Sequence, residues 1–261
     1  MEVLGYIAAF IMGATLGSIG GGGSILTVPI LVYLMDVPPT TATGYSLLIV
    51  GSAAAFGAYR YFRKGMINVK AATQFAIPSI IAVYLTRAYL MPSIPDPIIE
   101  SPVSIGKDIT IMILFAALMI GAAIMMLKNS EKTSPPEGDK HHFGLVIIEG
   151  AVVGVATGIL GAGGGFLIIP ALVLLMGMPM KEAVAASLLI IALKSLIGFI
   201  GDIQSGIDLQ LPMLVYFLIS TFLGIFSATM ISHRFDGKKL QKAFAYFTLI
   251  IAMIIFIKEL T

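Results

Sequence analysis

Apolar segments long enough to cross a lipid bilayer recur along the whole chain, and they constrain its fold more than any other feature. A transmembrane helix needs about 20 consecutive apolar residues. With 58% hydrophobic and only 11% charged residues, the chain has too little polar surface for a water-soluble particle. We therefore predict an all-α polytopic membrane protein, with apolar runs at about 3–35, 40–60, 69–90, 107–127, 143–176, 182–201, 210–232 and 243–258.

Two of these runs have an unusual length. Runs 3–35 and 143–176 are too long for one span and slightly short for two, and consecutive glycines interrupt each of them. Irregular backbone at membrane depth is tolerated where it lies inside protein or lines a cavity. We therefore expect each run to form a hairpin that turns at its glycines, Gly20-Gly21-Gly22-Gly23 in the first tip and Gly161-Ala162-Gly163-Gly164-Gly165 in the second tip.

An internal repeat relates the two hairpins. When the chain is shifted by 141 positions, residues 17–65 align with 158–206 without a gap, and 18 of the 49 pairs are identical. Self-similarity at a fixed spacing indicates a duplicated structural unit. We therefore divide the chain into a first membrane repeat (1–127), a cytoplasmic linker (128–142) and a second membrane repeat (143–261).

The distribution of Lys and Arg favours returning hairpins. If each glycine-broken run crossed the membrane once, the basic residues would divide 8 to 7 between the two sides; if each run returns, 12 face the cytoplasm. Positive charge concentrates in cytoplasmic loops. A hairpin plus three spans per half then gives two inverted-topology repeats with both termini outside, and the loop cations left outside are Arg87, Lys107 and Lys258.

The glycine tips are candidate substrate sites. The helices after each tip would direct N-terminal N–H groups and positive dipole ends at the membrane centre, an arrangement that suits an anion. A simple turn is the alternative, and the absence of Gly-Lys-Ser/Thr excludes a nucleotide-binding P-loop. The four-residue spacing of Gly13 and Gly17, and of Gly150, Gly154 and Gly158, indicates helix packing instead. The candidate residues at the tips are Gly20, Gly21, Gly22, Gly23, Ser24, Gly161, Gly163, Gly164, Gly165 and Phe166.

Three polar residues within the spans are further candidates. Ser46 and Ser187 occupy equivalent repeat positions and could donate hydroxyls to an anion, or bond back to their own helix. Lys194 is expected to be the only Lys or Arg well inside an apolar run. Intramembrane charge is costly and therefore indicates function. The alternatives for Lys194 are snorkelling to the interface and a pair with Glu149.

The glycine motifs resemble the TauE/SafE sulfite exporter family of membrane transporters. The resemblance covers nearly the whole chain and implies transport of sulfur-containing anions such as sulfite, thiosulfate or organosulfonates. The residues that carry it in the first repeat are Gly17, Gly20 to Gly23, Pro29, Ala42, Ser46-Leu47, Gly57 and Gly65. Those in the second are Gly158 to Phe166, Pro170, Ala183, Ser187-Leu188, Gly198 and Gly206-Ile207-Asp208.

Together these features predict a secondary transporter of small sulfur-containing oxyanions that works by alternating access in the cytoplasmic membrane. A cation (Na⁺/H⁺)-linked transporter or a channel for other small solutes is the alternative. An enzyme is disfavoured because the spans lack Cys, His and paired acids. We expect no cofactor, no metal and no nucleic-acid partner; the partners are a small anion and the lipid bilayer. Proton or ion coupling and homo-oligomerisation stay open.

Overall fold

A computed structural model of the chain describes residues 2–19, 21–97, 106–129, 143–174, 176–231 and 237–260. Every regular element within these ranges is helical, which confirms the all-α prediction. Five helical segments are long and apolar enough to cross a membrane: Pro39–Arg63, Val69–Ser93, Lys107–Met125, Glu182–Gln204 and Leu211–Ala228. The sixth expected span, 243–258, lies within helix α11 (Gly237–Leu260). These helices fit a multi-pass membrane protein.

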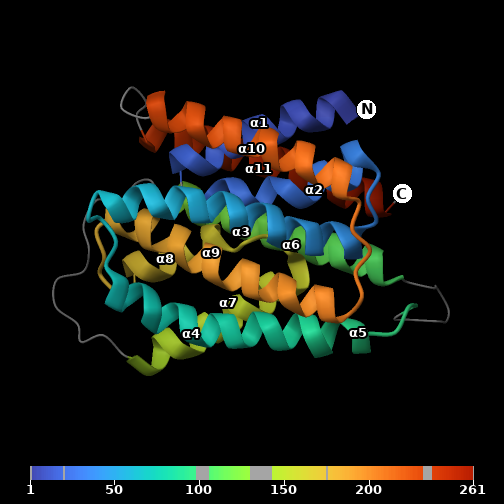
Figure 1. The fold of residues 1–261 in the computed structure, drawn as a ribbon, viewed down its shortest axis with the longest axis horizontal. Helices are drawn as coiled ribbons and strands as arrows, with labels where there is room; N and C mark the ends of the chain where they lie inside the picture. Colours follow the sequence, from blue (N-terminus) through green and yellow to red (C-terminus); the bar gives the residue numbers. More distant parts are fainter. Residues whose placement is uncertain are drawn as a thin grey trace.

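Two long helices, α3 (Pro39–Arg63) and α9 (Met180–Gln204), form the centre of the bundle. They pack side by side in opposite directions, because Gly44 lies against Asp202, Gly51 against Leu196 and Gly57 against Leu188. In Figure 1 this pair lies between an upper layer that contains α1 and α10 and a lower layer that contains α4 and α7. Positions that the sequence repeat makes equivalent therefore belong to antiparallel helices.

Each outer helix pair combines one helix from the first half of the chain with one from the second half. Helix α1 (Glu2–Ile19) packs along α10 (Leu211–Ile231), and α7 (Phe143–Leu160) packs along α4 (Val69–Leu85). The small residues of α1 and α7 permit this packing, since Gly13 lies against the Thr221 backbone and Gly154 against the Ser79 backbone. The packing role expected for these glycines is therefore present. Helix α6 (Lys107–Asn129) similarly packs on α11.

Chain direction shows how each glycine-broken run is folded. Helix α7 runs parallel to α4, and α4 runs parallel to α9, because Val83 and Arg87 of α4 and the following turn lie against Gly198 and Gly201. Helices α7 and α9 therefore run the same way, and α8 (Gly165–Leu174) between them must turn back.

The glycine-broken run of the first half is folded in the same way. Helices α1 and α10 are parallel, α10 and α3 are parallel through the contacts Tyr45–Gln210 and Phe56–Phe222, and α2 (Thr27–Met35) returns between α1 and α3.

Several predicted segments differ in detail from the structure. Run 69–90 continues from α4 into a π-helical turn, η2 (Thr86–Leu90), and the short helix α5 (Met91–Ser93). The first two residues expected in the linker, Lys128 and Asn129, are the last of α6. The rest of the linker, 130–142, lies outside the described residues, as do all three histidines.

Candidate functional site

The two glycine tips touch each other inside the bundle. The first tip belongs to a short 3-10 helix, η1 (Gly21–Leu26), in which the Ser24 hydroxyl donates to the Ala162 carbonyl of the second tip at 2.6 Å. Both residues are buried. Gly163 faces Ser24 and Val50, and Val50 adjoins Gly51, which packs against Leu196 of α9. The tips of the two halves therefore meet beside the middle of the central helix pair.

The second tip requires glycine because of its backbone conformation. Gly161, Gly163 and Gly164 have φ values of +68°, +62° and +71°, in the left-handed region that other residues rarely adopt. The tip is also crowded, since a Cβ on Gly161 would lie 2.2 Å from the Thr43 carbonyl oxygen. The Ser46 hydroxyl of α3 donates to the Gly161 carbonyl at 2.7 Å. Backbone and side chain together fix this turn.

The first tip is built differently. Gly21, Gly22 and Gly23 continue the chain as 3-10 helix without a positive φ, whereas the sequence led us to expect similar turns in both halves. Gly23 is needed for close approach, because its Cβ would lie 2.4 Å from the Leu16 backbone nitrogen. The α-helix after this tip, α2, begins at Thr27, whereas α8 begins at Gly165 directly within the second tip. Gly20 lies outside the described residues.

Lys194 lies beside the second tip and has no exposed surface. Its Nζ donates to the Thr157 hydroxyl at 2.6 Å, and this hydroxyl donates in turn to the Val153 carbonyl at 2.7 Å. A Cβ on Gly164 would lie 2.8 Å from the same Nζ. Both alternatives for Lys194 are therefore wrong: a snorkelling side chain would reach the interface, and among the described residues no ion pair joins it to Glu149.

Gly165, Phe166 and Ser187 are the remaining candidate residues. Gly165 and Phe166 begin α8 directly after the second tip. Ser187 of α9 donates to the Val184 carbonyl of its own helix at 2.8 Å, the bond that we weighed as its alternative role. The structure therefore brings together Ser24, Ser46, Gly161, Gly163, Gly164 and Lys194, and leaves Ser187 bonded within its helix.

Comparison with known proteins shows the family to which the chain belongs. The family model described as "Sulfite exporter TauE/SafE" matches residues 5–255. The chain belongs to the TauE/SafE family. Among its relatives, a "Probable membrane transporter protein" of Xylella fastidiosa is 28% identical over 93% of this chain and 90% of its own length. The "Probable membrane transporter protein YunE" of Bacillus subtilis is 30% identical over 79% of this chain and 78% of its own length. No solved structure matches the chain.

This TauE/SafE chain also contains a buried ion pair that the sequence analysis missed. Arg87 was assigned to an outside loop, but it lies in η2, is 2% exposed and pairs with Asp202 of α9 at 3.2 Å. Arg87 and Lys194 are therefore both buried, whereas the sequence analysis singled out Lys194 alone. A signal was present in the sequence, because Arg87 falls within run 69–90 rather than after it.

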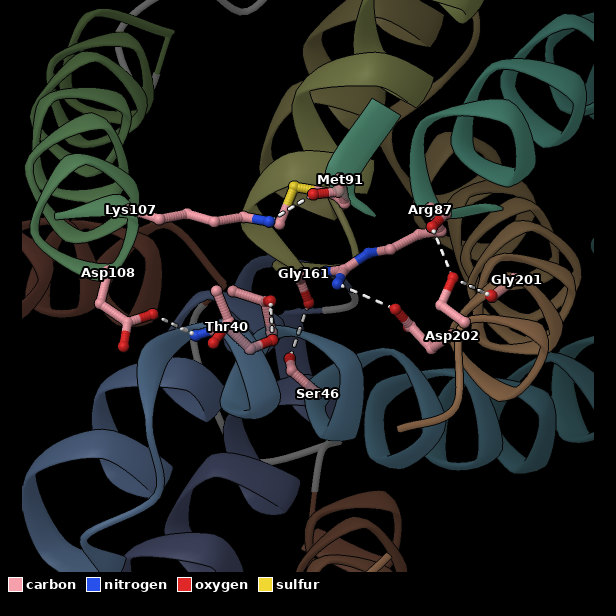
Figure 2. A network of polar contacts seen from close by, with 11 residues as sticks. Thr40, Ser46, Arg87, Met91, Lys107, Asp108, Gly161, Gly201 and Asp202 are labelled. Carbon is pink, nitrogen blue, oxygen red and sulfur yellow. Dashed lines mark hydrogen bonds and ion pairs between the residues drawn. The ribbon is translucent and has the colours of Figure 1, made fainter. Parts of the chain in front are cut away.

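Further polar contacts surround this ion pair, as Figure 2 shows. The Lys107 amine donates to the Met91 carbonyl, and the Thr40 backbone N–H donates to Asp108 at 2.9 Å. In the same view the side chains of Lys107 and Arg87 extend toward each other, and the Gly161 carbonyl accepts from Ser46. The second tip thus has Lys194 against Gly164 and Ser46 bonded to Gly161.

Proposed function

We propose that the chain is a secondary transporter of small sulfur-containing oxyanions, such as sulfite, thiosulfate or organosulfonates, in the cytoplasmic membrane. The observation that carries the proposal is the meeting of the two glycine tips next to a buried cationic side chain. Ser24 bonds to Ala162 across the tips, and Lys194 lies against Gly164. The family relationship supports transport as the activity.

Alternating access around this meeting point is the proposed mechanism. Each tip has a short helix after it, α2 or α8, and the hydrogen bonds from Ser24 to Ala162 and from Ser46 to Gly161 join the second tip to the first half of the chain. Separation of the Ser24–Ala162 contact would expose the second tip to one membrane side at a time. Transporters with repeat symmetry commonly bind substrate at the interface of the repeats.

The inverted relation of the repeats belongs to the same proposal. It is supported by the antiparallel packing of the equivalent helices α3 and α9, and by the exchanged pairs α1 with α10 and α7 with α4. Inversion would place both termini outside and residues 128–142 in the cytoplasm. An inverted pair of repeats can adopt two states that a pseudo-two-fold rotation relates and that open to opposite sides, as alternating access requires.

Uptake into proteoliposomes tests this function. Purified protein is reconstituted and supplied with radiolabelled sulfite, thiosulfate, taurine, sulfate, phosphate and Na⁺, each with and without a proton gradient. We expect saturable uptake of at least one sulfur oxyanion, with empty liposomes as the control. Uptake of Na⁺ alone would replace the proposal with the cation-linked alternative.

A further inference from the structure

Arg87 is held in an unusual backbone segment against the second repeat. It lies in the π-helical turn η2, and π-helical turns occur frequently at functional sites. The Cβ of Arg87 lies 2.9 Å from the position that a Cβ on Gly201 would occupy, so α9 approaches this turn closely. The side chain is 2% exposed and has Asp202 as its ion-pair partner.

The ion pair leaves one edge of the guanidinium without a protein partner. Asp202 Oδ1 accepts from Nη1, whereas the buried Nε and Nη2 of Arg87 and Oδ2 of Asp202 have no hydrogen-bond partner among the described residues. A buried ion pair offsets its desolvation only when further hydrogen bonds satisfy the remaining atoms. Nε and Nη2 form the parallel donor edge that binds oxyanions in a bidentate manner.

A series of contacts connects Arg87 to the second tip. Lys194 bonds to Thr157 of α7. Gly158, which follows Thr157, packs against Thr86. Thr86 directly precedes Arg87 in η2. Lys107 approaches Arg87 from α6, as Figure 2 shows. The side chains of Lys107 and Arg87 therefore point toward each other in this view.

The equivalent region of the first repeat is apolar. The repeat shift of 141 pairs Thr157 with Leu16, Lys194 with Ala53 and Asp202 with Tyr61. These three first-repeat residues line a small cavity with Gly17, Gly57, Leu188 and Ile225. Helices therefore pack at these positions in the first repeat without charged residues. The presence of Thr157, Lys194 and Asp202 in the second repeat needs another explanation.

We infer that the Nε/Nη2 edge of Arg87 binds the transported oxyanion at a second contact, between the second tip and the end of the bundle that carries Lys107. The inference rests on the proposed function and adds a site to it. Asp202 orients the guanidinium through Nη1 and competes with the anion for its charge. An anion at Arg87 would also satisfy the two buried donors that the protein leaves unpaired.

Two substitutions that act in opposite directions test the inference. Asp202→Asn keeps an acceptor for Nη1 and removes the competing charge, so the apparent KM for sulfite or thiosulfate uptake should fall by about fivefold. Arg87→Lys keeps the charge and loses the bidentate edge, so KM should rise by about tenfold or more. Arg63→Gln, at an exposed site, is the matched control and should leave KM unchanged.

The two shifts distinguish binding from structural support. If the pair only supports the fold, both variants will lose thermal stability in detergent. The KM values of the two variants will then not shift in opposite directions. Parent uptake with an unchanged KM in both Arg87→Lys and Asp202→Asn overturns this inference alone. Absence of oxyanion uptake by the parent overturns the proposed function and this inference with it.

Discussion

Ser46 and Ser187 occupy equivalent positions in the sequence repeat, yet their hydroxyls make different bonds. Ser46 donates across the bundle to the Gly161 carbonyl at 2.7 Å, whereas Ser187 donates to Val184 of its own helix at 2.8 Å. Of these two bonds, only the one from Ser46 joins the two halves of the chain. The halves thus share a fold but divide the polar contacts at the tips unequally.

This difference predicts unequal effects of the same substitution. Ser46→Ala leaves the buried Gly161 carbonyl without its donor and should destabilise the second tip by about 1–3 kcal/mol. Ser187→Ala removes a bond within one helix and should be nearly neutral, so it is the matched control. Thermal unfolding in detergent and uptake rates measure both effects. Equal losses in the two variants would contradict the asymmetry.

The hydroxyl of Thr157 gives a second prediction. Thr157→Val keeps the shape of the side chain but removes the acceptor of the buried Lys194 amine. An unpaired buried donor costs about 1–3 kcal/mol, so the thermal midpoint should fall and oxyanion uptake should decrease. Thr157→Ser retains the acceptor and should resemble the parent. A Thr157→Val protein with parent stability would show that Lys194 finds another partner.

The crowding at Gly164 gives a third prediction, in which one variant rescues another. A Cβ at this position would lie 2.3 Å from Thr157 Cγ2, and its φ of +71° adds strain of roughly 1–2 kcal/mol. Gly164→Ala should therefore lower stability and uptake. Adding Thr157→Ser removes the clashing methyl group and should restore part of both. Gly121→Ala, which meets nothing within 4 Å, is the control.

Much of the fold follows from patterns within the sequence. Apolar length predicts the helices, and the bounds of α1 (Glu2–Ile19) and α7 (Phe143–Leu160) differ by the same 141 positions as the aligned repeats. Both patterns arise because lipid requires continuous helical hydrogen bonding. Consecutive glycines also indicated the place of both tips, although only the second tip has glycines with positive φ among the described residues.

The polar pairs could not be predicted in the same way. Arg87 and Asp202 are 115 positions apart and meet only because α4 packs on α9 through Gly198 and Gly201. Arg87 lies near the end of an apolar run, where a loop cation and a buried cation have the same sequence pattern. Thr157 is likewise an ordinary helix residue until tertiary packing brings it to Lys194. Such contacts depend on helix rotation, which periodicity alone does not determine.

Membrane orientation is the subject of a fourth prediction. We expect Lys132 in the cytoplasm and the region of Pro97 outside, because 12 basic residues then face inward. The chain has no native cysteine, so single Lys132→Cys and Pro97→Cys variants can be labelled in intact cells with an impermeant maleimide. Pro97→Cys should react and Lys132→Cys should react only after lysis. The reverse pattern would contradict the proposed inverted topology.

Lys194 distinguishes an anion site from a cation site at the tips. It is the buried cationic side chain nearest to Gly164, and helix N-termini supply only about half a unit of positive charge each. Lys194→Met should therefore weaken binding of sulfite, thiosulfate or a sulfonate, and Lys194→Arg should be intermediate because a planar fork replaces a point charge. A cation site would respond in the opposite sense, since removal of a neighbouring positive charge tightens cation binding. Thermal shift and calorimetry in detergent, with each anion and with Na⁺, separate the two. Unchanged anion affinity in Lys194→Met would remove this residue from the site, and stabilisation by Na⁺ alone would favour the cation-linked transporter.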